Sequence, residues 1–290
     1  MDRQKFIRAA LGGAFAMDSL QDFKTFTNTL EKRDEKMPLL FVGHGSPMNG
    51  IEDNAFSAVW QTLGKQLPVP TAVLCISAHW LTRGTQVTAM EHPQTIHDFG
   101  GFPQALFDVQ YPAPGSPSLA EETATTIKSA PVGLDHEWGL DHGSWTVIRR
   151  MYPEAKIPVL QLSLDYNKSP QSHYALAKEL AALRKKGVLI MGSGNMVHNL
   201  RLMNWQTPES GFDWAETTNE KFKQLIRNRD HQPLLRYENL GEGAKLSIPT
   251  PEHYLPMLYV LALQEEKENV SFFNDKTVMG SISMTSFIMS

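Results

Sequence analysis

Residues 39–47 read LLFVGHGSP, an uninterrupted apolar run that ends at Gly43-His44-Gly45. Apolar runs bounded by turn-forming residues recur along the chain, at 72–77, 159–164 and 188–191. Continuous apolar residues, rather than an alternation of apolar and polar ones, are typical of strands buried on both faces of a parallel sheet. These three runs and the run at 39–42 are therefore predicted to be buried strands.

Segments with helical spacing of their apolar residues separate these runs. Helices are predicted over 54–67, 118–129, 144–151 and 169–186. Alternating strands and helices indicate an α/β fold, here a single domain with a central, largely parallel or mixed sheet flanked by helices. Farther along, the sequence predicts a mostly helical region, a further helix and a strand-rich tail, over 205–247, 251–266 and 270–290 respectively.

The overall composition excludes several classes of protein. The 290 residues include 27 Lys and Arg against 31 Asp and Glu, a formal net charge of −4, so neither nucleic acid nor an anionic membrane is an expected partner. No apolar run is long enough to cross a bilayer. Cys75 is the single cysteine, so the chain can form neither an intrachain disulfide nor a thiolate metal cluster.

The first 36 residues differ in character from the rest and form a predicted N-terminal extension ahead of a domain at 37–290. Arg3, Lys5 and Arg8 precede a short apolar stretch with an A-x-A-like sequence, which resembles an export leader over 1–20. The alternative is an amphipathic helix followed by a polar tether. A tether predicts a cytoplasmic protein, and a leader predicts a periplasmic one.

Histidines follow three of the predicted strands. His44 and His79 come directly after theirs, and His198 follows a Gly-Ser-Gly turn. Ligands of open α/β sheets bind outside the carboxyl ends of the strands, so these imidazoles are expected at one edge. A single histidine in such a place is more often a hydrogen-bonded loop residue, but three of them favour a shared function.

His253 is predicted in the first turn of the helix at 251–266, with Thr250 as the N-cap and Pro251 as the first helical residue. The positive end of the helix dipole disfavours imidazolium there, and neutral imidazole is the form that binds metals. About three such imidazoles would hold one divalent metal and leave positions open for water or substrate. Imidazole suits Zn, Fe, Cu and Ni.

Two further segments carry alternative interpretations. His142 lies in a turn before a helix, where it could donate a proton to substrate, or could be incidental to a helix cap formed by Asp141 or Ser144. The aperiodic segment 92–117, which includes His97-Asp98-Phe99, is either a lid over an apolar pocket or an ordinary packed loop. No role is assigned to the remaining histidines, His92, His136, His173 and His231.

Six ordered motifs resemble a known family: GHGSPMN, SAHW, IHDFGGFP with YPAPGSP, LDHGSW, GSGNMVHNLR and PTPEHYLPMLYVL. They are similar to those of the bacterial 4,5-DOPA extradiol dioxygenase-like proteins, within the class III extradiol ring-cleavage dioxygenases (the protocatechuate 4,5-dioxygenase β-subunit superfamily). The resemblance runs from Met37 to the C-terminus, and residues 1–36 lie outside it.

The resemblance implies a single α/β domain with one non-haem metal per chain, held by His44, His79 and His253. It also implies that His198 is the catalytic base, although in zinc-bound relatives it can count as a ligand, and that His142 is the acid near the substrate. The wider superfamily usually has Glu where this chain has His253. This difference leaves the metal open: Zn(II) is compatible with the site, whereas oxygen chemistry needs Fe(II).

The implied reaction inserts O2 into a catechol such as DOPA beside its two hydroxyls and yields a muconic semialdehyde. Two other functions remain open from the sequence, a zinc-dependent hydrolase with Glu252 or Asp141 as base, and a non-catalytic metal-binding scaffold. No basic cluster marks a site for a carboxylated substrate, although Arg83, Arg149 and Arg201 are single candidates. The sequence does not indicate an oligomeric state.

Overall fold

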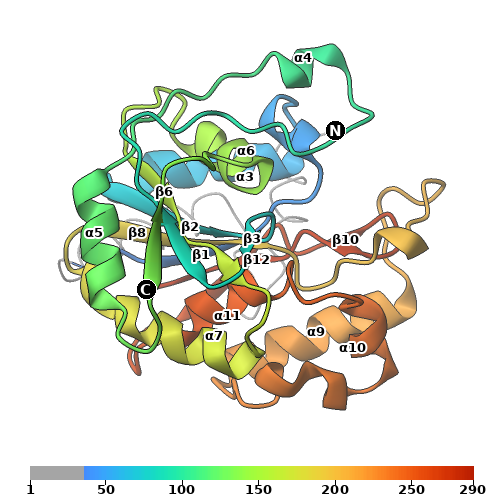
Figure 1. Cartoon of the computed structure of the whole chain (residues 1–290). Coiled ribbons are helices and arrows are strands. Elements are labelled where there is room, and N and C mark those ends of the chain that lie inside the picture. The colour runs from blue at the N-terminus through green and yellow to red at the C-terminus, as the bar shows by residue number, and fades with distance from the viewer. Residues whose placement is uncertain (1–35) are drawn as a thin grey trace.

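A six-stranded sheet forms the centre of the protein, in a computed structural model that describes residues 36–290 (Figure 1). The strand order is β6-β2-β8-β1-β12-β9. The first four strands are parallel to one another, β12 pairs antiparallel with β1, and the edge strand β9 pairs antiparallel with β12. The bounds are β1 Leu39–Gly43, β2 Ala72–Ser77, β6 Val159–Gln161, β8 Val188–Gly194, β9 Val270–Phe273 and β12 Ser286–Met289. The mixed sheet within an α/β domain confirms the predicted fold class.

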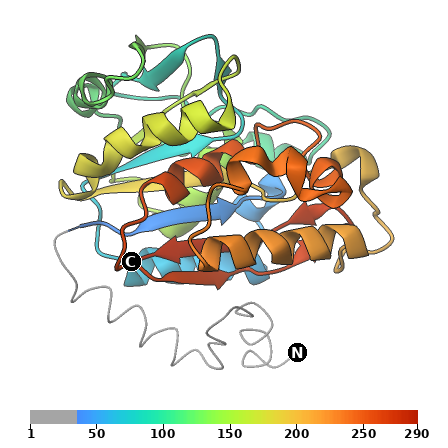
Figure 2. The same cartoon turned by 90° about the horizontal axis from the view of Figure 1, so that it is seen from below.

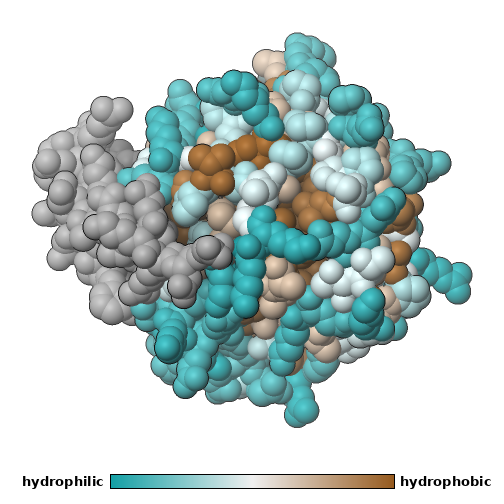
Figure 3. Space-filling model, turned by 90° about the vertical axis from the view of Figure 1, so that its left-hand side faces the viewer, coloured by the Kyte–Doolittle hydropathy of each residue, from teal (hydrophilic) through white to brown (hydrophobic). Residues whose placement is uncertain are grey.

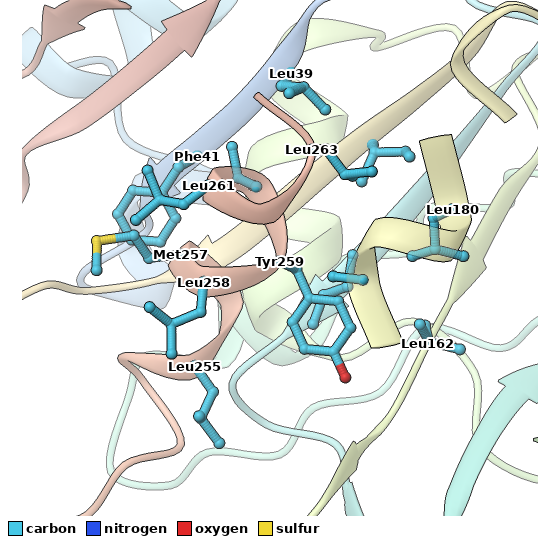
Figure 4. Packing of buried hydrophobic residues seen from close by; sticks show 14 of the residues in the cluster. Leu39, Phe41, Leu162, Leu180, Leu255, Met257, Leu258, Tyr259, Leu261 and Leu263 are labelled. Atoms are coloured by element: carbon cyan, nitrogen blue, oxygen red, sulfur yellow. The ribbon is translucent and has the colours of Figure 1, made fainter. Parts of the chain in front are cut away.

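Helices cover both faces of this sheet, as Figures 1 and 2 show. On one face lie α3 (Ala55–Gln66) and α6 (His142–Met151), and on the other lie α7 (Pro170–Ala177) and α11 (Leu255–Ala262). Each strand sends alternate side chains into two separate apolar cores. Phe41 of β1, for example, packs with Leu261 of α11 in one core (Figure 4), whereas Val42 belongs to the other. Burial on both faces explains why the strands are continuously apolar.

The remaining elements surround this centre. The short strands and 3-10 helices are β3 Leu81–Thr82, β4 Thr85–Thr88, β5 Val132–Asp135, β7 Leu164–Asp165, β10 Thr277–Val278, β11 Ile282–Ser283, η1 Pro47–Gly50, η2 Lys178–Leu180, η3 Leu200–Leu202 and η4 Leu234–Leu240. The other helices are α4 Gln104–Phe107, α5 Pro117–Thr126, α8 Ala181–Arg184, α9 Asp213–Arg227 and α10 Glu242–Ser247. The mostly helical region and the strand-rich tail are thus confirmed.

The helix predicted over 251–266 is wrong at its start. The helix α11 begins at Leu255 with Tyr254 as its N-cap, so Thr250 does not cap it and His253 lies in the preceding turn. The carbonyl of His253 accepts a hydrogen bond from the amide of Asn195 at 2.8 Å. Asn195 directly follows β8, so this hydrogen bond ties the turn at His253 to the sheet, and the regular helix begins after that turn. The dipole argument for a neutral His253 therefore loses its basis.

Two other predicted elements are interrupted. The run at 159–164 splits into β6 and β7, because β7 leaves the central sheet and pairs with β3. The helix predicted over 169–186 becomes α7, η2 and α8, with a change of dihedral angles at Leu180 (φ −77°, ψ −5°).

The predicted N-terminal extension lies outside the described residues, apart from Lys36. Within 36–290, no helix combines the length and the apolar character that crossing a membrane requires. Figure 3 shows one face of the surface, where separate apolar areas lie among hydrophilic side chains.

Candidate metal centre

The histidines that follow the strands meet at the carboxyl end of the parallel sheet. His44 continues from β1, and its amide donates to the carbonyl of Gly194 at the end of β8 (3.2 Å). His79 follows β2, and the amide of the preceding Ala78 donates to the carbonyl of Ser193 (3.0 Å). The adjacent strand ends therefore place both imidazoles at one edge, as the sequence predicts.

Two glycines permit this crowded arrangement around His44. A Cβ atom on Gly43 would lie 2.8 Å from the backbone of Met284, which is too close for any side chain. Gly45 has φ of 60°, a conformation that glycine adopts without the strain other residues suffer. A close approach of the backbone at Gly43 and a positive φ at Gly45 thus both allow His44 its position.

The ring nitrogens of His44 and His79 face each other. Their Nε2 atoms lie 3.1 Å apart. The Nδ1 atom of His44 is 3.0 Å from the hydroxyl of Ser193, whose own hydrogen is donated to the carbonyl of Gly143. Since a hydroxyl has one hydrogen to give, Nδ1 of His44 must be the donor to Ser193. The Nε2 atom of His44 consequently carries a lone pair directed at His79.

The carboxylate of Asp98 supports the neighbouring rings. One oxygen accepts from the amide of His142 at 2.9 Å, and the other lies 3.0 Å from Nδ1 of His142 and 3.3 Å from Nδ1 of His79. Burial opposes ionisation of this carboxyl, but the hydrogen bonds from His142 outweigh it and lower the pKa of Asp98. Sequence reasoning included Asp98 only as part of a lid, and its position beside two histidines was missed.

His198 and His253 form the second part of the cluster. Their rings stack with centroids 3.5 Å apart and planes within 6° of parallel. The ring of His253 lies 5.4 Å from that of His44 and 5.0 Å from that of His79, so all the predicted site histidines converge. The Nδ1 atom of His253 is buried without a hydrogen-bond partner, and a carboxylate oxygen of Glu252 lies 3.5 Å from it.

Burial keeps these imidazoles uncharged. Loss of solvent, followed by repulsion from neighbouring histidines, puts the pKa values of His44 and His253 well below the usual 6.5. Burial is also the largest cause that lowers the pKa of His79 to about 3 and that of His198 to about 4. At neutral pH these rings therefore offer lone pairs, as metal ligands and proton acceptors must.

The side chains fit a divalent metal. One ligand atom from each of His44, His79 and His142 lies within 4.8 Å of the others, and the same holds for His198, Glu252 and His253. Two nitrogens bound to one metal at about 2.0–2.1 Å each are at most about 4.2 Å apart, a limit that the 3.1 Å between His44 and His79 satisfies. A cation between these nitrogens would also remove the repulsion between their lone pairs.

The segment 92–117 packs beside the cluster. Phe99 stands edge-on to His142 with centroids 5.6 Å apart, and it also contacts Phe102 and Phe107 at 5.5 and 5.1 Å. Apart from α4, the segment has no regular helix or strand. The aromatic side chains form an apolar wall next to His142, and a function of the segment as a lid stays a prediction.

Asp141 has the structural role that was the alternative for the turn at 139–145. It caps α6 by accepting from the amide of Ser144 at 3.1 Å, and it also accepts from the hydroxyl of Ser77 at 2.7 Å. Burial raises the pKa of Asp141 to about 6. Asp141 therefore caps α6 and His142 lies in the cluster, and a role of His142 as proton donor stays a prediction.

Two further residues named in the sequence analysis, His173, to which no role was assigned, and Arg149, a candidate substrate contact, lie apart from the cluster. His173 is bonded to the hydroxyl of Tyr259 (2.9 Å) within the core. Arg149 lines a surface cavity of about 820 Å³ between α3 and the chain after α6. No histidine lines that cavity, so Arg149 is not a contact for a substrate bound at the imidazoles.

The chain is similar to known proteins along most of its length. The family described as catalytic LigB subunit of aromatic ring-opening dioxygenase matches residues 38–285. A 4,5-DOPA dioxygenase extradiol of Escherichia coli (strain K12) is 51% identical over 255 residues, 87% of this chain and 94% of that protein. Its counterpart in Beta vulgaris is 34% identical over 258 residues, 85% of this chain and 94% of that protein. A crystal structure of an uncharacterized E. coli K12 protein has a TM-score of 0.77 and 45% identity, covering 88% of this chain and 100% of that one.

Proposed function

Because this chain belongs to the family of catalytic LigB subunits of aromatic ring-opening dioxygenases, we propose that it cleaves a catechol such as DOPA, with Fe(II) as its metal. The family makes the protein a metal-binding extradiol dioxygenase that acts on a small aromatic molecule and O2. The observation that carries the finer proposal is the pair of facing Nε2 atoms of His44 and His79, 3.1 Å apart.

We assign His44, His79 and His253 as the metal ligands. Support for His253 comes from its buried, unpartnered Nδ1 and from the closeness of its ring to those of His44 and His79. His142 is the competing third ligand, because its ligand atom lies within 4.8 Å of those of His44 and His79. We assign it a different role, that of proton donor to the substrate, as the resemblance of its LDHGSW motif implies.

Held by these histidines, Fe(II) would supply the oxygen chemistry that redox-inert Zn(II) cannot. Proton transfer is assigned to side chains of the cluster. His198 is neutral, with a pKa of about 4, and its ring can accept a proton from a catechol hydroxyl. The Asp98 carboxylate accepts from Nδ1 of His142 and orients that ring, to which we assign the transfer of a proton to the substrate.

Anaerobic metal loading tests the proposed reaction. The metal-free protein is loaded with Fe(II) or, as the control, with Zn(II), then given DOPA and finally O2. We expect oxygen uptake and a new yellow absorbance with Fe(II) alone, and neither without the catechol. Absence of both signals with Fe(II), for DOPA and for other catechols, would contradict the proposal. Hydrolysis of an ester by the Zn(II) form would instead support the zinc hydrolase.

Two single variants distinguish the candidate third ligands. If His253 binds the metal, His253→Ala retains less metal after dialysis than His142→Ala does. His142→Ala is then expected to hold about one metal per chain and to lose turnover. The opposite order of metal retention would transfer the ligand role to His142.

A further inference from the structure

Asp98 lies between two imidazoles of the cluster, and we propose that it is a positioning residue for the metal site. Its carboxylate keeps hydrogen on Nδ1 of both His79 and His142, which leaves Nε2 of each ring with the lone pair. The inference deepens the proposed function, because it concerns the same site and the metal that the site would hold.

The contacts of Asp98 support this arrangement. Its two oxygens accept hydrogen bonds from the amide (2.9 Å) and Nδ1 (3.0 Å) of His142, and one of them lies 3.3 Å from Nδ1 of His79. An ionised carboxylate accepts hydrogen bonds and has none to donate. Nδ1 of His142 therefore carries hydrogen, and Nδ1 of His79 carries it, facing Asp98, whenever Nε2 of that ring shares a cation with Nε2 of His44.

Ser193 does for His44 what Asp98 does for its two partners. Its hydroxyl accepts from Nδ1 of His44, so Nε2 of His44 carries its lone pair because of an acceptor behind the ring. The acceptors come from different parts of the fold, Ser193 from β8 and Asp98 from the 92–117 segment. Hydrogen-bonded partners behind ligand rings commonly fix the tautomer and the ring orientation at metal sites.

The segment on either side of Asp98 is fixed, so the carboxylate is held in place. The amide of Ile96 donates to the carbonyl of Leu140 (2.7 Å), and the carbonyl of Ile96 accepts from the indole of Trp145 (2.9 Å). Phe99 packs on His142 from the other side. The side chain of Asp98 is 17% exposed, which limits competition from water for its hydrogen bonds.

The substitution Asp98→Asn tests the hydrogen-bonding role of the side chain while nearly keeping its size. The amide has nearly the same volume but only one acceptor oxygen, and its NH2 group would face one of the Nδ1 atoms. That ring would have to move its hydrogen to Nε2, where it blocks metal binding. We expect metal affinity to fall by about 10–100-fold, the usual cost of losing such a partner.

The matched control is Asp108→Asn in the same segment. Asp108 is exposed and accepts from the side chain of Gln104 (2.9 Å), so this variant removes one charge without touching an imidazole. Zn(II) affinity is measured by competition with a chromophoric chelator, and the tautomers of the metal-free protein are measured by 15N NMR at neutral pH. Thermal unfolding checks the fold of each variant.

The proposal requires a weakened affinity and a changed tautomer in Asp98→Asn, with both unchanged in Asp108→Asn. Zn(II) affinity within about twofold of the wild type in Asp98→Asn, with unchanged tautomers, would overturn it. Should Asp98→Asn fail to fold, Asp98→Glu carries the test, because it keeps an ionised acceptor. Asp98→Glu must then retain the Nδ1–H tautomers, and their loss in a folded protein would also overturn the proposal.

Neither readout uses a catechol or O2. A protein that binds metal through Asp98-oriented rings but does not cleave DOPA would refute the proposed substrate and leave this inference standing. A protein that cleaves DOPA while Asp98→Asn binds metal normally would do the reverse.

Discussion

The two parts of the histidine cluster differ in what stands behind each ring. His44 and His142 each have a side-chain acceptor bonded at Nδ1, Ser193 and Asp98 respectively, and Nδ1 of His79 lies 3.3 Å from Asp98. Within the part of the chain that the structure describes, no such acceptor bonds to the rings of His198 and His253, which stack on each other instead.

The difference indicates that the two parts of the cluster have different chemical roles. A ring with an acceptor behind it has a fixed tautomer and a fixed direction, which suits a metal ligand or a proton donor. Of the two stacked rings, His198 can gain or lose a proton without breaking a hydrogen bond, which suits a general base, whereas we assign His253 as a ligand from its closeness to His44 and His79. The predictions below test whether the acceptors, rather than the histidines alone, account for these different roles.

Removal of His44, whose Nδ1 is bonded to Ser193, is expected to have the largest effect on metal binding and turnover. In His44→Ala the facing pair of nitrogens is lost, so bound metal should fall to background and turnover should drop by more than the ~10²-fold expected for loss of a base. Metal content by mass spectrometry and oxygen uptake measure both. His136→Ala, which removes an exposed histidine, is the control. Near-normal metal content in His44→Ala would show that the facing pair does not hold the metal.

Removal of the stacked base should separate the two functions. We expect His198→Ala to keep about one metal per chain and to lose about 10²-fold or more in turnover, because a proton acceptor is missing while the ligands remain. Added imidazole should restore part of the turnover by filling the space beside His253. Unchanged turnover would remove His198 from the mechanism, and loss of metal would make it a ligand.

The positions of His44 and His79 were largely predictable, because they depend on the central sheet. Parallel strands end at a common edge, so apolar runs followed by His44 and His79 were sufficient to bring these two residues together. Gly43 and Gly45 indicated a crowded backbone from their position alone. The buried strands supplied this signal because their continuous apolar character has few alternative explanations.

The acceptors were not predictable in the same way. Asp98 meets His142 because the loop is fixed by contacts such as that of Ile96 with Leu140, and an aperiodic segment gives no sign of such pairing in its sequence. His253 was predicted as a site residue for a wrong reason, since the turn before α11 depends on the bond between its carbonyl and Asn195. Both failures concern long-range hydrogen bonds rather than local patterns.

A smaller effect is expected from removing one acceptor. Ser193→Ala deprives Nδ1 of His44 of its partner, so metal affinity should fall by about tenfold, at the lower end of the usual range. Ser286→Ala is the matched control, because Ser286 is equally buried but its hydroxyl bonds only to the backbone, at Gly43 and Met284. An equal loss of Zn(II) affinity in both variants would mean that the effect is general destabilisation.

The smallest expected effect concerns a single proton on His198. Its pKa is about 4 in the folded protein against 6.5 for an unperturbed histidine, so between these pH values the unfolded chain binds a proton that the folded protein does not. The free energy of unfolding of the metal-free protein must then decrease as the pH falls, by up to about 1.4 kcal/mol per pH unit from this residue. His198→Asn removes that contribution, so denaturant unfolding from pH 7 to pH 4 should give a shallower decrease in the variant. His136→Asn should follow the wild type. A steeper decrease in His198→Asn would mean that the folded protein holds His198 protonated, and a ring already carrying that proton could not act as the base.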